Sequence, residues 1–269
     1  MAAARDQFRR VAERYAASRT HSDKRFLERI VGLAKPAKDE SVLDVATGPG
    51  FVGVEFAKKG SDVVGTDITL EMLKHAKERR KRDGVSMEFV MAEAGHQPFR
   101  DETFGIAVSR LAFHHMNDPA RAIESMTRVV KPGGRIVVAD LVVSEDSGVA
   151  DFHNNFERLR DASHVKSLKL SEWKEIFRNV QLRLDKVALS KVRLEVREWA
   201  ERAGFPKERA PELANMLEKA PPKVRRALSV FHQRGLVFFL NTRAILVATK
   251  QDKPRVQKAF SLARRIVRK

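Results

Sequence analysis

The chain has 269 residues, of which 43% are hydrophobic and 32% charged, so it can bury a sizeable core as one elaborated domain or two small ones. It contains no cysteine, which excludes disulfide frameworks, cysteine-based zinc sites and thiolate nucleophiles. Its 52 Lys and Arg exceed its 35 Asp and Glu, and the net charge of +17 favours acidic partners without choosing among phosphates, nucleic acid and anionic lipid.

The first 35 residues predict helices. Apolar side chains recur at helical spacing over residues 8–15 and again over 26–33, before Pro36 ends the run. No apolar leader segment begins the chain, and its apolar runs are far shorter than the roughly 18 residues of a membrane-spanning helix. We therefore expect a soluble protein of the cytoplasm.

Short apolar runs then alternate with helical periodicity. Helices are predicted between successive strands, over residues 52–59, 70–82 and 119–130. The strands are predicted over residues 41–46, 62–67, 86–91, 104–111 and 135–143. This alternation is typical of a parallel, doubly wound α/β sheet, whose ligand lies beyond the carboxyl ends of the strands.

The alternation stops after residue 143. Helices are predicted over 151–160 and from 171, strands over 180–189 and 237–249, and broken helices over 193–234. The tail over 253–269 has the pattern of a basic amphipathic helix. A helix docked on the core with a solvated basic face is the simpler interpretation, and contact with nucleic acid or an anionic membrane surface is the alternative.

A glycine-rich turn follows the first of these strands. The segment 44–53 contains the pattern G-x-G-x-x-G, and Asp67 lies nineteen residues after Gly48, where it could bind two ribose hydroxyls. Both features suit either NAD or S-adenosylmethionine. Asp44 distinguishes the two cofactors, because a carboxylate beside the turn would repel a pyrophosphate but attract the ammonium of a methionine group. The turn therefore favours S-adenosylmethionine.

These residues resemble the class I S-adenosylmethionine-dependent methyltransferases, within the group of ubiquinone and menaquinone biosynthesis enzymes. The segments that carry the resemblance are 42–50, 65–73, 89–99, 113–119 and 128–134, and segments 159–165 and 170–173 resemble a bacterial subgroup of uncharacterised methyltransferases.

The resemblance implies a Rossmann-like α/β fold: a mixed seven-stranded sheet with helices on both faces and an antiparallel last strand. We expect one methyltransferase domain over 1–249 and a basic tail over 250–269. Within the domain we expect an N-terminal helical lid, a cofactor-binding core and a two-part helical cover, over 1–35, 36–143, and 144–179 with 191–235.

The resemblance also implies a site for S-adenosyl-L-methionine, with S-adenosyl-L-homocysteine as product. In that site Asp44 would bind the methionine ammonium and Asp67 the ribose. The backbone from Ala46 through Gly48 to Gly50 would surround the methionine carboxylate.

The adenine would lie against Ile68 and Met72. Glu93 would accept a hydrogen bond from the adenine amino group, beside the backbone of Ala94, and Tyr15 would cover the cofactor from the lid.

Ser109 and Arg110 would face the sulfonium. Three positions depart from the family pattern, since Ala46 replaces a common glycine, Glu93 replaces an aspartate, and residues 95–97 replace acidic and leucine residues. The adenine pocket is the part that these departures affect most.

Histidines follow the fourth strand of the predicted core. A neutral imidazole near the transferred methyl group could take a proton from the acceptor, and His115 and His164 are the candidate bases. The sequence favours equally a structural role for His115, in which its ring forms a hydrogen bond to a neighbouring loop. His114 and Arg160 are expected to contact the substrate, and no metal site is expected.

The predicted activity is therefore methyl transfer by in-line displacement to a small organic acceptor, such as a quinol, phenol or enol. The alternative is a nucleic-acid methyltransferase that uses the basic surface and tail. Residues 109–112 lack the Asn/Asp-Pro-Pro-aromatic element used on flipped bases, and aromatic residues make up only 7% of the chain. A non-catalytic cofactor-binding protein is the third interpretation, and the sequence leaves the oligomeric state open.

Overall fold

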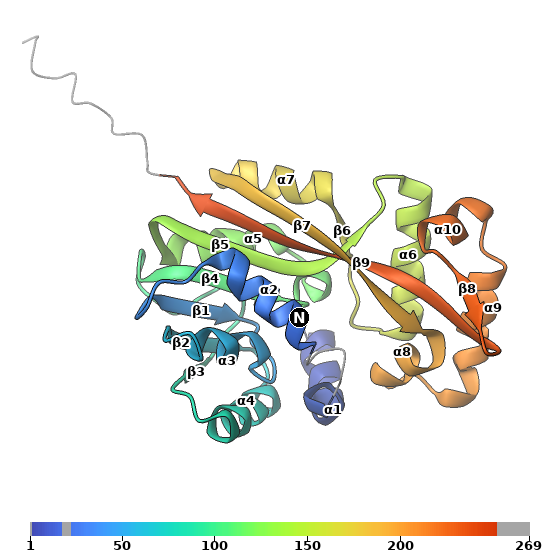
Figure 1. Cartoon of the computed structure of the whole chain (residues 1–269), viewed down its shortest axis with the longest axis horizontal. Coiled ribbons are helices and arrows are strands. Elements are labelled where there is room, and N and C mark those ends of the chain that lie inside the picture. The colour runs from blue at the N-terminus through green and yellow to red at the C-terminus, as the bar shows by residue number, and fades with distance from the viewer. Residues whose placement is uncertain (1, 18–22, 252–269) are drawn as a thin grey trace, which may run out of the picture.

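The protein is described by a computed structural model that covers residues 2–17 and 23–251 (Figure 1). The side chain of Tyr15 lies outside this description, so its predicted contact with the cofactor is not placed. The basic helix predicted over 253–269 also lies outside the described residues, and so does the nucleic-acid or membrane contact expected of it.

A mixed sheet forms the centre of the molecule. Its main path has seven strands in the order β3-β2-β1-β4-β5-β9-β7, with β6 paired to β5 and β8 paired to β9. Strands β1 to β5 are parallel, and β9 is antiparallel to both β5 and β7. This confirms the predicted Rossmann-like fold. The strands are β1 (Ser41–Val45), β2 (Asp62–Asp67), β3 (Glu88–Met91), β4 (Phe104–Arg110), β5 (Val130–Val143), β6 (Leu168–Lys169), β7 (Leu182–Glu195), β8 (Phe231–Gln233) and β9 (Leu236–Lys250).

Helices cover both faces of the sheet because neighbouring residues of each strand point to opposite sides. Leu43 packs in a core with α5 (Pro119–Val129) and α7 (Leu170–Asn179). Val42, its neighbour, packs in a second core with α2 (Lys24–Ala34) and α3 (Phe51–Ala57). The continuous apolar strands of the sequence are therefore explained by burial on both sides.

The last two long strands extend beyond the sheet into a third core (Figure 1). It is built by α6 (Ser147–Arg160), α8 (Val196–Arg202), α9 (Ala210–Glu218) and α10 (Pro222–Ala227), around Phe156, Trp199 and Phe239. The helices predicted over 193–234 are partly wrong, because β7 continues to Glu195 and residues 231–233 form β8. Pairing along β9 keeps both segments extended.

The turn after β1 requires left-handed backbone at three positions. Gly48 and Gly50 have φ angles of 52° and 78°, which glycine adopts without steric cost. Ala46 has a φ of 55°, which places its Cβ close to the following carbonyl. The family's usual glycine at this position is therefore explained by backbone geometry, and the alanine holds a strained conformation.

We expect Ala46→Gly to raise the free energy of unfolding by about 1 kcal/mol, because glycine relieves the strain. The matched control is Ala57→Gly, which replaces an alanine of helix α3 and should lower the free energy of unfolding by about 1 kcal/mol. Denaturant unfolding measures both values. If both variants lowered the free energy of unfolding by similar amounts, the backbone of Ala46 would not be strained.

Candidate functional site

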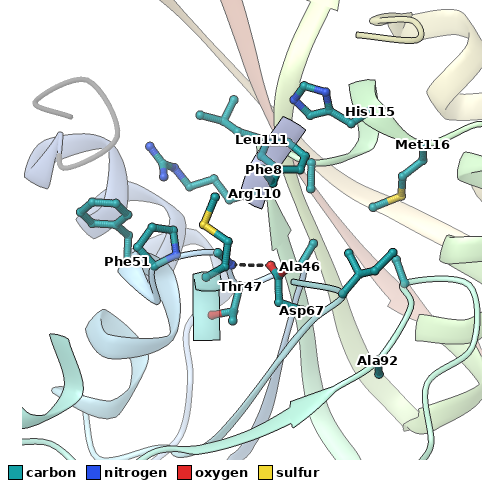
Figure 2. Close-up of a pocket in the computed structure, with 16 residues that line it drawn as sticks. Phe8, Ala46, Thr47, Phe51, Asp67, Ala92, Arg110, Leu111, His115 and Met116 are labelled. Carbon is teal, nitrogen blue, oxygen red and sulfur yellow. Dashed lines mark hydrogen bonds between the residues drawn. The ribbon is translucent and has the colours of Figure 1, made fainter. Parts of the chain in front are cut away.

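A cavity lies at the carboxyl ends of β1, β2 and β4, where the doubly wound fold predicts a ligand (Figure 2). Eight of the predicted site residues line it: Ala46, Gly48, Asp67, Ile68, Met72, Ala94, Arg110 and His115. Two of the other eight lining residues, Thr47 and Pro49, belong to the predicted backbone from Ala46 to Gly50. The remaining six were not predicted as site residues, because they are apolar residues without a motif of their own: Phe8, Phe51, Ala92, Leu111, Ala112 and Met116.

Asp67 ties the end of β2 to the glycine turn. Its Oδ2 accepts a hydrogen bond from the Gly48 amide at 2.8 Å, and its Oδ1 accepts one from the Thr69 amide at 2.9 Å. Burial raises the pKa of Asp67, against the effect of these hydrogen bonds. The carboxylate therefore holds the turn in place while it faces the cavity.

Asp44 lies behind the turn and does not line the cavity. Its Oδ2 accepts hydrogen bonds from the Thr47 hydroxyl at 2.6 Å and the Gly53 amide at 2.9 Å. The side chain is 1% exposed, and burial raises its pKa to about 6. Asp44 thus fixes the turn and the first turn of α3, and its contact with a ligand ammonium stays a prediction.

Three other residues predicted to bind the cofactor do not line the cavity either. Gly50 caps the start of α3, Glu93 is half-buried between the lining residues Ala92 and Ala94, and Ser109 is fully buried within β4. The hydroxyl of Ser109 has no hydrogen-bond partner in the protein.

The segment after β4 forms one wall of the cavity. Leu111 has a φ of 51°, an uncommon backbone conformation for a branched side chain, and its amide donates to the Ala139 carbonyl at 2.8 Å. The Nε and Nη2 atoms of Arg110 are buried without a partner in the protein. Burial and the nearby Arg243 lower the pKa of Arg110 to about 10, so its guanidinium is charged at neutral pH.

A buried carboxylate on β5 fixes this wall. The Oδ2 of Asp140 accepts hydrogen bonds from the amides of Ala112 at 3.2 Å and Phe113 at 2.8 Å. Its Oδ1 lies 2.5 Å from the Nδ1 of His114. Burial opposes ionisation of both groups, but their mutual attraction prevails, so the pKa of His114 is raised and that of Asp140 is lowered.

His115 is held in one tautomer. The Ser163 hydroxyl donates its only proton to Asp161 at 2.6 Å, so at 3.0 Å from His115 Nδ1 it can only accept. Nδ1 therefore carries the proton, and Nε2 keeps a lone pair. Burial, and next the charge of His114, lower the pKa of His115 to about 3, so the ring is neutral at neutral pH.

The ring of Phe8, from α1 (Ala2–Ala17), lies edge-on against His115 with 4.8 Å between ring centroids. Through Phe8, helix α1 contributes to the wall of the cavity, and Figure 2 shows Phe8 among the lining residues.

His164, the other candidate base, lies behind His115 with 6.5 Å between the ring centroids. Its Nε2 donates to Asn154 Oδ1 at 2.9 Å, and the same oxygen accepts from the Ser167 amide. Burial, and next the charge of His114, lower the pKa of His164 to about 4. His164 does not line the cavity, so the structure places only His115 where a ligand could meet a base.

A second cavity lies behind Leu111, which lines both cavities. It contains His114 and Arg160, the two residues expected to contact the substrate. Its other lining residues are Leu141, Glu157, Val192, Leu194, Trp199, Arg202, Asn241 and Arg243. No local pattern predicted Asn241 and Arg243 in this cavity, because they come from β9, more than 80 residues after Arg160 in the chain.

Within residues 2–17 and 23–251, no group of three His, Asp or Glu side chains could hold a metal ion. No helix in this part of the chain is long and apolar enough to cross a membrane.

Comparisons with known proteins agree with this fold. Residues 43–138 match the family described as a methyltransferase domain. The uncharacterised methyltransferase YcgJ of Bacillus subtilis is 29% identical over 242 residues, which cover 89% of this chain and 96% of YcgJ. A crystal structure of YcgJ has a TM-score of 0.80 at 27% identity, covering 87% of this chain and all of that chain.

Two further relatives match shorter segments. The uncharacterised protein YafE of Escherichia coli is 32% identical over 173 residues, which cover 63% of this chain and 82% of YafE. A demethylmenaquinone methyltransferase of Renibacterium salmoninarum is 35% identical over 117 residues, which cover 44% of this chain and 48% of that enzyme.

The raised pKa of Asp44 predicts a pH-dependent stability. Because the folded-state pKa of about 6 lies above the unfolded value near 3.8, the folded state binds the proton more tightly between these values. The free energy of unfolding should therefore fall by on the order of 2–3 kcal/mol, relative to Asp44→Asn, as the pH rises from 4 to 6. Denaturant midpoints across this range measure the difference, and parallel curves would contradict it.

The lowered pKa values of His115 and His164 can be observed directly by NMR. We expect their ring proton shifts to stay constant between pH 8 and pH 5, since both rings remain neutral there. His115→Gln and His164→Gln assign the two resonances. A titration midpoint near 6.5 at either ring would refute the burial effect.

Proposed function

Because the chain belongs to the class I S-adenosylmethionine-dependent methyltransferases, we propose that it methylates a small organic acceptor at the cavity beside β1, β2 and β4. When bound, S-adenosylmethionine supplies an electrophilic methyl group on a positively charged sulfur. The observation that carries the proposal is the lining of the cavity: Asp67, the unpartnered Nε and Nη2 of Arg110, and a neutral His115 come together there.

The residues at the β2 end suit the adenosine half of the cofactor. Asp67 offers carboxylate oxygens to the ribose hydroxyls, in addition to the amide of Gly48. Ile68 and Met72 offer an apolar surface to adenine, and Ala94 lines the same cavity. Glu93 lies outside the lining, so its contact with the adenine amino group depends on its reaching the cavity edge.

Arg110 suits the carboxylate of the methionine half better than the sulfonium expected from the resemblance, because a charged guanidinium repels a positively charged sulfur. Its Nε and Nη2 form the side edge of the guanidinium, and both are buried without a partner in the protein. A carboxylate matches this edge with two parallel hydrogen bonds. In this arrangement Asp44 acts as a positioning residue: it holds Thr47 and Gly53, and its negative charge favours the methionine ammonium through the turn.

His115 suits an acceptor with a hydroxyl group. With Nδ1–H held by Ser163, Nε2 can accept a hydrogen bond and orient the nucleophilic oxygen. The low pKa makes full proton transfer to His115 unfavourable, so the best acceptor is already acidic, such as a phenol, quinol or enol. The demethylmenaquinone methyltransferase relative supports an acceptor of this chemistry.

A small acceptor is favoured over a nucleic acid because the reactive wall is covered. His114 and His115 are 7% and 6% exposed, and Phe8 lies against His115. A polynucleotide would need an open groove for its backbone at this point. Phe8, Leu111 and Met116 also give the cavity an apolar lining, which suits a small organic molecule.

The cofactor proposal predicts that S-adenosylhomocysteine binds and that NADH does not. Asp67→Ala should weaken S-adenosylhomocysteine binding about tenfold or more, because a charged hydrogen-bond acceptor is lost. Asp62→Ala, on the exposed end of the same strand, is the matched control and should bind like the wild type. Isothermal calorimetry measures each affinity. Equal affinities in the two variants, or binding of NADH, would contradict the assigned ribose site.

A further inference from the structure

The second cavity adjoins the proposed cofactor site. It lies between the end of β4, α6, β7, α8 and β9, and Leu111 separates it from the first cavity. The strained backbone of Leu111 places this side chain between the two cavities. A molecule held in the second cavity therefore reaches the wall against which methyl transfer is proposed.

This cavity is lined by buried cationic donors that the protein does not satisfy. Arg243 is 6% exposed, and its Nη2 donates to Asp23 at 3.1 Å, whereas its Nε and Nη1 have no partner in the protein. The Nε of Arg160 is also buried without a partner. Buried charged donors without partners are costly, so a ligand that accepts from them is favoured.

The one acidic residue of the lining is already neutralised. Glu157 Oε1 accepts from Asn241 Nδ2 at 2.9 Å, and Oε2 lies 3.1 Å from Arg160 Nη2. Burial opposes ionisation of Glu157, but Arg160 prevails, and the pKa of Glu157 is lowered. Both oxygens of Glu157 therefore contact Arg160 and Asn241. The unpartnered Nε and Nη1 of Arg243 remain available to an anionic ligand.

The position of Arg243 also favours an anion. Its guanidinium lies 3.8 Å from the centroid of the Phe26 ring, and that of Arg110 lies 5.8 Å from the same centroid. Two positive charges so placed repel each other in a buried setting. Asp23 pairs with Nη2 of Arg243 alone and is partly exposed, so a ligand carboxylate can still bind the unpartnered Nε and Nη1 of Arg243.

We infer that the second cavity binds a carboxylate group of the methyl acceptor, held by Arg243 with Arg160 beside it. This inference rests on the proposed function and narrows the acceptor to small organic acids. Asn241 Oδ1, the unpartnered acceptor of the lining, is available to a hydroxyl group on the same molecule.

Paired probes test this inference on the full chain saturated with S-adenosylhomocysteine. Benzoate, 4-hydroxybenzoate and hexanoate are each compared with the corresponding primary amide by ligand-observed NMR and calorimetry. At least one acid should bind at least tenfold more tightly than its amide. Arg243→Met should abolish this preference, and Arg243→Lys, which keeps the charge, should restore part of it.

Arg183→Met is the matched control, because Arg183 is an arginine of the same sheet paired with Asp185 but exposed and outside both cavities. It should keep the preference of the wild type. Arg243 is chosen over Arg160 because Asp23, its partner, is partly exposed, whereas loss of Arg160 would leave Glu157 buried and unpaired.

The outcomes separate the two proposals. If S-adenosylhomocysteine binds but no acid is preferred over its amide, or if Arg243→Met keeps the preference, the carboxylate site is refuted and the methyltransferase site stands. If S-adenosylhomocysteine does not bind the wild type, the proposed function fails, and this inference fails with it.

Discussion

Both cavities depend on the hydrogen bonds that the buried carboxylate of Asp140 accepts from the segment after β4. This carboxylate holds the amides of Ala112 and Phe113 and the ring of His114, so the segment after β4 turns sharply at Leu111. Leu111 then divides the cavity of Asp67 from that of Arg243. A single buried carboxylate thus positions the wall against which two ligands would meet, and the adjacent His114 favours its ionised form.

Most of the fold could be predicted from the sequence, because burial on both faces leaves continuous apolar strands separated by helical periodicity. Each of the seven strands on the main path of the sheet overlaps a predicted strand, although β5 begins at Val130, five residues before its predicted start, and the glycine turn lies at the end of β1. The segment 193–195 and β8 were missed because their extended conformation comes from pairing with β9, not from local periodicity.

The candidate site divides in the same way. Residues that belong to the strand ends, such as Asp67 and Arg110, were predicted because the fold brings such ends together. The role of Asp44 in holding Thr47 could not be read from spacing, since it depends on which way a buried carboxylate points. Arg243 was missed because a charged residue in a late strand carries no local signal, and only packing shows its unpartnered donors.

The central claim is that the cofactor cavity and the acceptor cavity meet at Leu111. A crystal structure of the complex with S-adenosylhomocysteine tests it most directly. In this complex the ribose hydroxyls should bind Asp67, and the amino-acid carboxylate should bind Arg110. The sulfur should lie beside Leu111, and the side that carries the methyl group in the cofactor should face the second cavity. A ligand whose sulfur lies away from Leu111, or whose ribose does not contact Asp67, would contradict it.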